Sequence, residues 1–120
     1  MAVITVLGAG AMGSALTRPL VEAGWQVRLW GSIYDAAILD AIDAGHVHPT
    51  LKETISPAVT TFRAGQLAQA VNQAQVVVIS VASGAVVSVL EQVGPYLGDV
   101  ESLWLTSKGF WQTETKVELL

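Results

Sequence analysis

The chain opens with a strand-like run that meets a glycine-spaced turn. Residues 3–7 are apolar and largely β-branched, and Gly8, Gly10 and Gly13 follow as a helical pattern begins. In such an arrangement the first glycine permits a tight turn, the second leaves room for a pyrophosphate, and the third lets the helix pack close to the strand. The positive end of the helix then favours the ligand's negative charge. The opening therefore predicts a dinucleotide site; the alternative is an empty glycine-rich connection.

The order of segments along the chain predicts one α/β domain. Apolar stretches alternate with helical ones, and their spacing suits right-handed crossovers between parallel strands. The expected strands are residues 3–7, 26–30, 59–62, 76–81 and 102–106, and the expected helices are residues 12–23, 34–44, 64–73 and 84–97. We therefore expect a doubly wound parallel sheet of the Rossmann type with about five strands.

In a sheet of this kind the ligand crevice lies at the carboxyl ends of the strands. The segments that follow the expected strands there are residues 8–13, 31–32, 81–83 and 107–109. Trp30 ends its strand at this crevice, where its ring could lie against an adenine, whereas the other tryptophans are typical of a core. These segments are the places to look for chemistry.

Composition excludes several classes of function. The net charge is −4 with only six Lys and Arg residues, so we expect no nucleic-acid partner. Cysteine is absent, which excludes disulfides and cysteine-ligated metal sites. Hydrophobic residues make up 52% of the chain, but glycine and serine interrupt its two membrane-span candidates, residues 1–17 and 76–90. We attribute the apolar excess to strands buried on both faces, and expect a cytoplasmic protein without membrane insertion.

The residues after the second expected strand leave the choice of coenzyme open. A site built for NAD often places Asp or Glu on the adenosine ribose, about 20 residues past the glycines. Here the segment reads Leu29-Trp30-Gly31-Ser32, and the nearest acid is Asp35. No arginine stands there to bind the 2′-phosphate of NADP, although Ser32 could donate one hydrogen bond. The sequence is compatible with NAD or NADP.

Lys108 follows the last expected strand, beside Gly109 at the crevice edge. A lysine in a loop is commonly a solvated surface charge. At this edge, however, an ammonium group could stabilise the alkoxide charge that develops as a ketone is reduced, or hold a substrate phosphate. His46 and His48 lack the further ligands of a metal site, so we expect a loop contact and no metal.

Several segments, in order, resemble the N-terminal domain of the NAD(P)-dependent glycerol-3-phosphate dehydrogenases. The similar segments are residues 4–16 with the glycine motif, Val27-Arg28-Leu29-Trp30-Gly31, His48-Pro49-Thr50-Leu51, residues 74–83 and Ser107-Lys108-Gly109-Phe110. Many dehydrogenases share the glycine motif, whereas the Leu-Trp-Gly and Ser-Lys-Gly segments in this order are more specific. The resemblance runs over essentially the whole chain.

The resemblance implies reversible reduction of dihydroxyacetone phosphate to sn-glycerol 3-phosphate, feeding phospholipid biosynthesis, by an enzyme that is a homodimer at full length. It places Ala11 and Met12 along the dinucleotide, with Ser32 near the adenosine end. Lys108 would reach the nicotinamide side and the substrate, as a catalytic residue. The candidate coenzyme-binding residues are then Gly8, Gly10, Ala11, Met12, Gly13, Trp30, Gly31, Ser32, Val81, Ala82, Ser83 and Lys108.

Three departures from the family pattern bear on these expectations. Ser32 stands where many members have Arg, and Ala82 replaces a common Pro. Nothing in the chain corresponds to the catalytic lysine of the family's second, helical domain. We therefore expect residues 1–120 to be the N-terminal dinucleotide-binding domain of a longer enzyme, without the C-terminal helical domain. Alone, the chain should bind dinucleotide weakly and turn over nothing measurable.

Two other interpretations remain open. Other oxidoreductases with a GxGxMG start include β-hydroxyacid dehydrogenases, pyrroline-carboxylate reductases and ketopantoate reductases, and the Ser107-Lys108-Gly109 segment argues against them. From a different class, the chain could be a non-catalytic module that senses the redox state of a nicotinamide dinucleotide.

Overall fold

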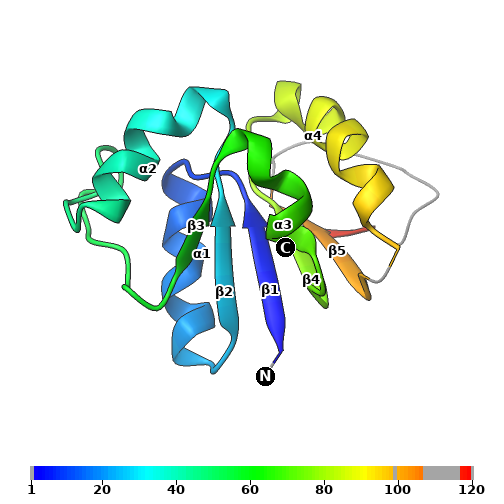
Figure 1. The fold of residues 1–120 in the computed structure, drawn as a ribbon, viewed down its shortest axis with the longest axis horizontal. Helices are drawn as coiled ribbons and strands as arrows, with labels where there is room; N and C mark the ends of the chain where they lie inside the picture. The colour runs from blue at the N-terminus through cyan, green and yellow to red at the C-terminus, as the bar shows by residue number, and fades with distance from the viewer. Residues whose placement is uncertain (1, 99, 107–116, 120) are drawn as a thin grey trace.

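The strand that precedes the glycine turn, β1 (Val3–Leu7), lies in the middle of a parallel sheet (Figure 1). The computed structural model of the chain describes residues 2–98, 100–106 and 117–119. The other strands are β2 (Gln26–Trp30), β3 (Thr60–Phe62), β4 (Val76–Ile79), β5 (Ser102–Leu105) and β6 (Val117–Leu119), in the order β3-β2-β1-β4-β5-β6. Every residue of β1 is buried, as expected of a strand with layers packed on both faces.

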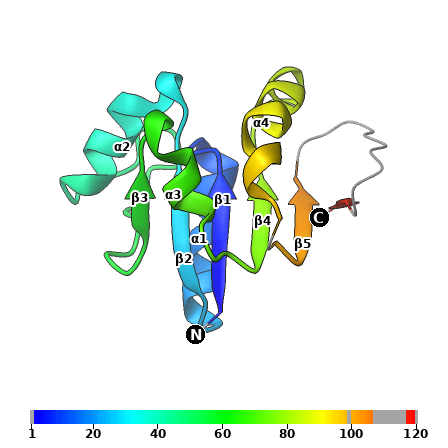
Figure 2. The same cartoon turned by 45° about the vertical axis from the view of Figure 1, so that its right-hand side comes forward.

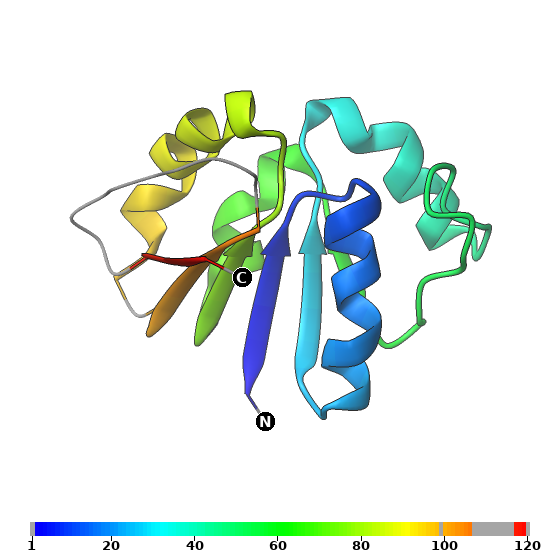
Figure 3. The same cartoon turned by 180° about the vertical axis from the view of Figure 1, so that it is seen from behind.

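Helices cover both faces of the sheet. On one face lie α1 (Ala11–Glu22) and α2 (Ala36–Asp43), and Figure 3 shows α1 running alongside β1 and β2. On the other face lie α3 (Leu67–Val71) and α4 (Val86–Val93), which Figures 1 and 2 show in front of the strands. No helix within the described residues is both long enough and apolar enough to span a membrane. The expected doubly wound α/β architecture is confirmed.

Alternate residues of β1 supply the two cores between sheet and helices. Val3 and Leu7 belong to the cluster that includes the buried faces of α3 and α4. Ile4 and Val6 belong to the opposite cluster, where Leu39 of α2 is fully buried. Because successive side chains of a strand point to opposite faces, an apolar run without alternation is what a sheet covered on both sides requires.

The strand bounds lie close to expectation, while the helices are more divided than expected. Each of β1 to β5 begins and ends within two residues of its predicted position. The predicted helix 34–44 is the 3₁₀ helix η1 (Ile33–Asp35) followed by α2, and the predicted helix 84–97 is η3 (Ser83–Ala85), α4 and η4 (Gly94–Tyr96). Pro95 lies in η4, where it has no N–H to continue the α-helical bonding.

The strand β6 is an addition to the five strands that the sequence leads us to expect. It pairs in parallel with β5, so that Leu119 stands opposite Leu105. Three residues are too few for a period of two to be told from a loop. The strand is defined by its partner β5, which is a tertiary contact that the local pattern does not contain.

Polar side chains of the sheet hold the end of the short helix α3. Thr5 donates from Oγ1 to the carbonyl of Ala70 at 2.5 Å, and the Arg28 guanidinium donates to the same carbonyl at 3.1 Å. These bonds satisfy a carbonyl at the C-terminal end of the helix, where intrahelical donors run out. Burial lowers the pKa of Arg28 from its ordinary value. The guanidinium nevertheless stays charged at neutral pH, because arginine is not deprotonated in proteins.

The pairing register brings the carboxyl ends of neighbouring strands to one edge. Leu7 stands opposite both Trp30 and Ile79, and Ile79 stands opposite Leu105. The segments that follow these strands therefore start side by side at this edge. The segment after β1 starts with Gly8. This edge is where the sequence predicts a ligand crevice.

Candidate functional site

The glycine turn is closed by backbone contacts that leave no space for side chains at its two ends. Gly8 has a φ of +126°, and a Cβ atom on it would lie 2.1 Å from the carbonyl oxygen of Ser80. A Cβ on Gly13 would lie 2.0 Å from the carbonyl oxygen of Gly8. The tight turn and the close approach of helix to strand that the motif predicts are both present.

Gly10 has the opposite surroundings. It is the N-cap of α1 in an extended conformation, and a Cβ atom on it would meet nothing within 4 Å. The first N–H groups of α1 have no partner inside the helix, and the positive end of the helix dipole coincides with them. An open backbone surface beside such N–H groups suits an anion that must approach closely.

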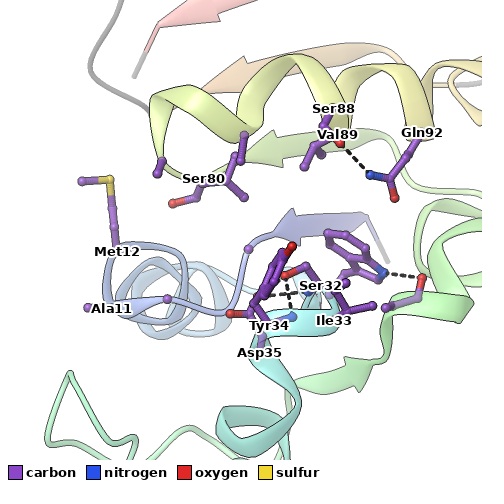
Figure 4. A pocket seen from close by; sticks show the side chains of 17 residues that line it. Ala11, Met12, Ser32, Ile33, Tyr34, Asp35, Ser80, Ser88, Val89 and Gln92 are labelled. Carbon is purple, nitrogen blue, oxygen red and sulfur yellow. Dashed lines mark hydrogen bonds between the residues drawn. The ribbon is translucent and has the colours of Figure 1, made fainter.

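A pocket of about 760 Å³ borders this turn (Figure 4). It lies between the ends of β1, β2 and β4 on the sheet side and α4 on the other side. Eight of the candidate residues line it: Gly8, Gly10, Ala11, Met12, Trp30, Ser32, Val81 and Ala82. The structure thus brings together three segments that are far apart in the sequence, at the edge where a coenzyme is expected.

The end of β2 presents a hydrogen-bonded loop to the pocket. Ser32 donates from its backbone N–H to a carboxylate oxygen of Asp35 at 3.0 Å, and its Oγ accepts from the N–H of Tyr34 at 3.2 Å. These reciprocal bonds form a capping box at the start of η1. Asp35 carries the only charge among the described residues that line the pocket. No cation therefore faces the pocket from the described part of the chain.

Trp30 and Gly31 lie deeper than the sequence indicates. Trp30 is only 1% exposed and donates from Nε1 to the carbonyl of Ala64 at 3.4 Å, so its ring is packed into the core where it forms part of the pocket wall. Gly31 is buried and does not line the pocket; a Cβ on it would lie 2.8 Å from a methyl carbon of Leu39. In this structure Gly31 allows α2 to pack against the end of β2.

Several lining residues are absent from the sequence-based candidates. Ile33 and Tyr34 stand at the mouth beside Ser32, and Tyr34 is 88% exposed. On the opposite wall α4 and the turn before it contribute Ala85, Ser88, Val89 and Gln92. Their spacing of three, one and three residues is that of one helix face. That signal is visible in the sequence, but which face turns to the pocket depends on the packing of α4.

The hydroxyl group of Ser80 lies in the wall of the pocket. Ser80 is 7% exposed, and its Oγ has no hydrogen-bond partner within the described residues. It follows β4 and lines the pocket. A buried hydroxyl without a partner costs free energy. A ligand that filled the pocket could supply the missing hydrogen bond. The glycine turn and the Ser80 hydroxyl both fit a polar, phosphate-bearing molecule.

Gly13 is not among the residues that line this pocket. Gly13 supports the turn from inside α1, and Ser83 begins η3. Lys108, the candidate catalytic residue, and Gly109 lie outside the described residues.

Comparisons with known proteins identify relatives of the chain. A family model described as "NAD-dependent glycerol-3-phosphate dehydrogenase N-terminus" matches residues 3–120. The NADP(+)-dependent glycerol-3-phosphate dehydrogenase of Archaeoglobus fulgidus is 40% identical over 115 residues, which are 96% of this chain and 34% of that protein. The chain thus spans about a third of the length of this curated relative.

Solved structures share the fold. A glycerol-3-phosphate dehydrogenase from Coxiella burnetii superposes with a TM-score of 0.77 at 24% identity, over 92% of this chain and 34% of that one. A ketopantoate reductase from Ralstonia eutropha gives a TM-score of 0.73 at 21% identity, over 98% of this chain and 39% of that one. At such identities the likeness establishes the fold alone, and enzymes with different substrates share it.

Proposed function

The chain belongs to the NAD-dependent glycerol-3-phosphate dehydrogenase family, and we propose that it is the coenzyme-binding part of an enzyme that reduces dihydroxyacetone phosphate. The reaction would be reversible and would yield sn-glycerol 3-phosphate. We further propose that the whole protein is a cytoplasmic homodimer that supplies phospholipid biosynthesis. The sequence match supports the family, and the glycine turn beside the pocket supports the binding of a dinucleotide coenzyme.

The observation that carries this proposal is the contrast among the three glycines. A Cβ atom on Gly8 or Gly13 would lie only 2.1 or 2.0 Å from a backbone carbonyl oxygen. Gly10, in contrast, has free space around its Cβ position and borders the pocket. A turn that only connected a strand to a helix would need no open glycine at the N-cap of the helix. The open position is explained by a ligand that approaches the backbone there.

The residues around the pocket then have distinct tasks. Gly10, Ala11 and Met12 would bind the pyrophosphate of NAD or NADP through backbone N–H groups at the start of α1. Ser32 would lie at the adenosine end, and Val81, Ala82 and Ser83 would border the coenzyme from the β4 side. When bound, the reduced nicotinamide supplies the hydride for ketone reduction.

For Lys108 we propose a catalytic role. Its ammonium would stabilise the negative charge that develops on the substrate oxygen, or hold the substrate phosphate. The family resemblance and its position beyond the end of β5 support this role. A second domain would then complete the substrate site.

The test is turnover by the protein as its gene encodes it. Oxidation of NADH and NADPH is followed with dihydroxyacetone phosphate, ketopantoate and a β-keto acid as substrates. We expect turnover with dihydroxyacetone phosphate, and a loss of about a hundredfold or more in kcat/KM for Lys108→Met. Lys52→Met, at an exposed loop position, is the matched control and should leave the rate unchanged.

Each other outcome corresponds to a rival interpretation. Turnover with ketopantoate or the β-keto acid alone would show a different reductase on the same fold. Binding of NADH without turnover of any substrate would favour a non-catalytic sensing module. Binding of neither dinucleotide at millimolar concentration would show the glycine turn to be an empty connection.

A further inference from the structure

A histidine in the long loop between α2 and β3 reaches the glycine turn. His48 is 0% exposed, although the loop residues on either side of it are exposed. Its Nε2 lies 2.8 Å from the carbonyl oxygen of Ala9, a residue 39 positions away in the sequence. Its Nδ1 accepts from the backbone N–H groups of Thr50 at 3.1 Å and Leu51 at 3.0 Å. The ring therefore spans from its own loop to the turn.

These partners determine the tautomer of His48. A backbone N–H only donates, so the Nδ1 that faces Thr50 and Leu51 carries no proton. The carbonyl of Ala9 only accepts, so the Nε2 that faces it carries the proton. The imidazole is neutral, and each of its nitrogens has a different task.

The Ala9 carbonyl also accepts a second bond. Ser14, in the first turn of α1, donates from Oγ to it at 3.0 Å. The peptide bond between Ala9 and Gly10 is trans, and in a trans peptide the C=O and the N–H point in opposite directions. Fixing the Ala9 carbonyl therefore fixes the direction of the Gly10 N–H, which points away from the His48 ring.

The loop around His48 has its own backbone bonds. The N–H of His48 donates to the carbonyl of Glu53, and the N–H of Lys52 donates to the carbonyl of His48, both at 2.9 Å. These bonds shape residues 48–53 without any help from the turn. The bond from Nε2 is therefore not needed to close the loop, and its partner is the glycine turn.

We propose that His48 is a positioning residue for the coenzyme. By holding the Ala9–Gly10 peptide, it presents the Gly10 N–H to the pyrophosphate and pre-organises the turn before the ligand arrives. This inference rests on the proposed dinucleotide site. Pre-organisation of this kind raises affinity because the bound conformation costs no ordering at the moment of binding.

Two conservative variants separate the two tasks of the ring. In His48→Gln the terminal amide nitrogen reaches about as far as Nε2 and donates to Ala9, but nothing replaces Nδ1. In His48→Asn the side-chain oxygen replaces Nδ1 as acceptor for Thr50 and Leu51, but the side chain is too short to reach Ala9. His46 is exposed, so His46→Gln and His46→Asn are the matched controls.

The experiment measures the dissociation constants of NADH and NADPH by titration calorimetry on the protein as its gene encodes it, together with its melting temperature. We expect His48→Gln to keep both constants within about threefold, and His48→Asn to weaken them about five- to tenfold, as for one lost hydrogen bond. The His46 variants should match the wild type.

A second readout does not depend on binding. Nitrogen NMR of the wild-type protein should show His48 with a protonated Nε2 and an unprotonated Nδ1. A protonated Nδ1 would overturn the inference even if His48→Asn failed to fold. Equal dissociation constants for the Gln and Asn variants would overturn it as well. If the wild type bound neither dinucleotide at millimolar concentration, the proposed function would fail first and this inference with it.

Discussion

Gly8 and Ser80 meet through their backbones: a Cβ atom on Gly8 would stand 2.1 Å from the carbonyl oxygen of Ser80. The φ of +126° at Gly8 is a conformation that residues with a Cβ rarely adopt. Gly8→Ala therefore adds a strained backbone to a steric clash with a backbone atom. Each effect costs about 1–3 kcal/mol, so we expect unfolding to become easier by about 3 kcal/mol or more.

Urea-induced unfolding of the whole protein measures this change. Gly24→Ala is a useful control, because Gly24 also has a positive φ but has free space around its Cβ position. The control should cost only the backbone strain, about 1 kcal/mol. Equal losses for both variants would show that the clash with Ser80 is relieved by a small shift, contrary to the close contact described.

Gly10→Ala is expected to spare the fold and to weaken coenzyme binding. Gly10 has a φ of −66°, which alanine adopts without strain, and open space around its Cβ position. The free energy of unfolding should change by less than about 1 kcal/mol, since the poorer N-cap is offset by a less flexible unfolded chain. The added methyl group occupies space that a pyrophosphate would need, so the dissociation constant of NADH should rise about tenfold or more.

Titration calorimetry and urea unfolding on the same preparation check this prediction. A variant that unfolds easily would show that Gly10 serves the turn as Gly8 does. A stable variant with unchanged affinity for both NADH and NADPH would place the coenzyme away from Gly10.

Substitution of Ser80, whose hydroxyl lacks a partner within the described residues, should change stability and coenzyme affinity in opposite directions. Its Oγ has no partner within the described residues, so Ser80→Ala removes a buried polar group without breaking a bond. We expect the free energy of unfolding to stay the same or to rise by up to about 1 kcal/mol. If a bound coenzyme satisfies this hydroxyl, the dissociation constant of NADH should rise about fivefold.

Ser88→Ala is the control for Ser80→Ala. Ser88 also lines the pocket, but its side chain is exposed and its Oγ already accepts a hydrogen bond from Gln92. Its loss should leave binding within about twofold, as for a surface hydrogen bond. A large fall in stability for Ser80→Ala would show that Ser80 has a structural partner.

The glycine turn and the sheet could be predicted from the sequence because their signals are local. A glycine encodes its own backbone freedom, so Gly8 and Gly13 indicate the turn before any contact is known. The apolar runs of β1 and β4 likewise indicate strands that are buried on both faces. In these cases the residue type and its immediate neighbours decide the structure.

The missed parts depend on contacts between distant segments. The partner of His48 is Ala9, and nothing near either residue in the sequence indicates the contact. The face of α4 that holds Ser88 and Gln92 turns to the pocket only because α4 packs on β4 and β5. The local pattern indicates that β2 ends at Trp30, but the burial of the Trp30 ring is decided by the core around it. Local sequence patterns do not indicate such contacts between segments that are far apart in the chain.

With Ser32 at the proposed adenosine end of the site, a substitution at this position tests the choice between NADH and NADPH. The 2′-phosphate of NADP would meet the carboxylate of Asp35 and no cation from the described lining residues. An arginine at position 32 would place a planar, permanently charged donor beside that phosphate. We expect Ser32→Arg to raise the ratio of NADPH to NADH affinity about tenfold, a shift that shrinks as salt is added.

The same substitution removes the N-cap of η1, because the Ser32 hydroxyl accepts from the N–H of Tyr34. We expect a loss of about 1 kcal/mol in the free energy of unfolding from this cause. Ser32→Gln is the matched control, since it loses the cap and adds a side chain without charge. The ratio of the two dissociation constants, measured at low and high salt, isolates the guanidinium. If Arg and Gln shift the ratio equally, the adenosine 2′-position does not lie at Ser32, and the coenzyme runs across the pocket in another direction.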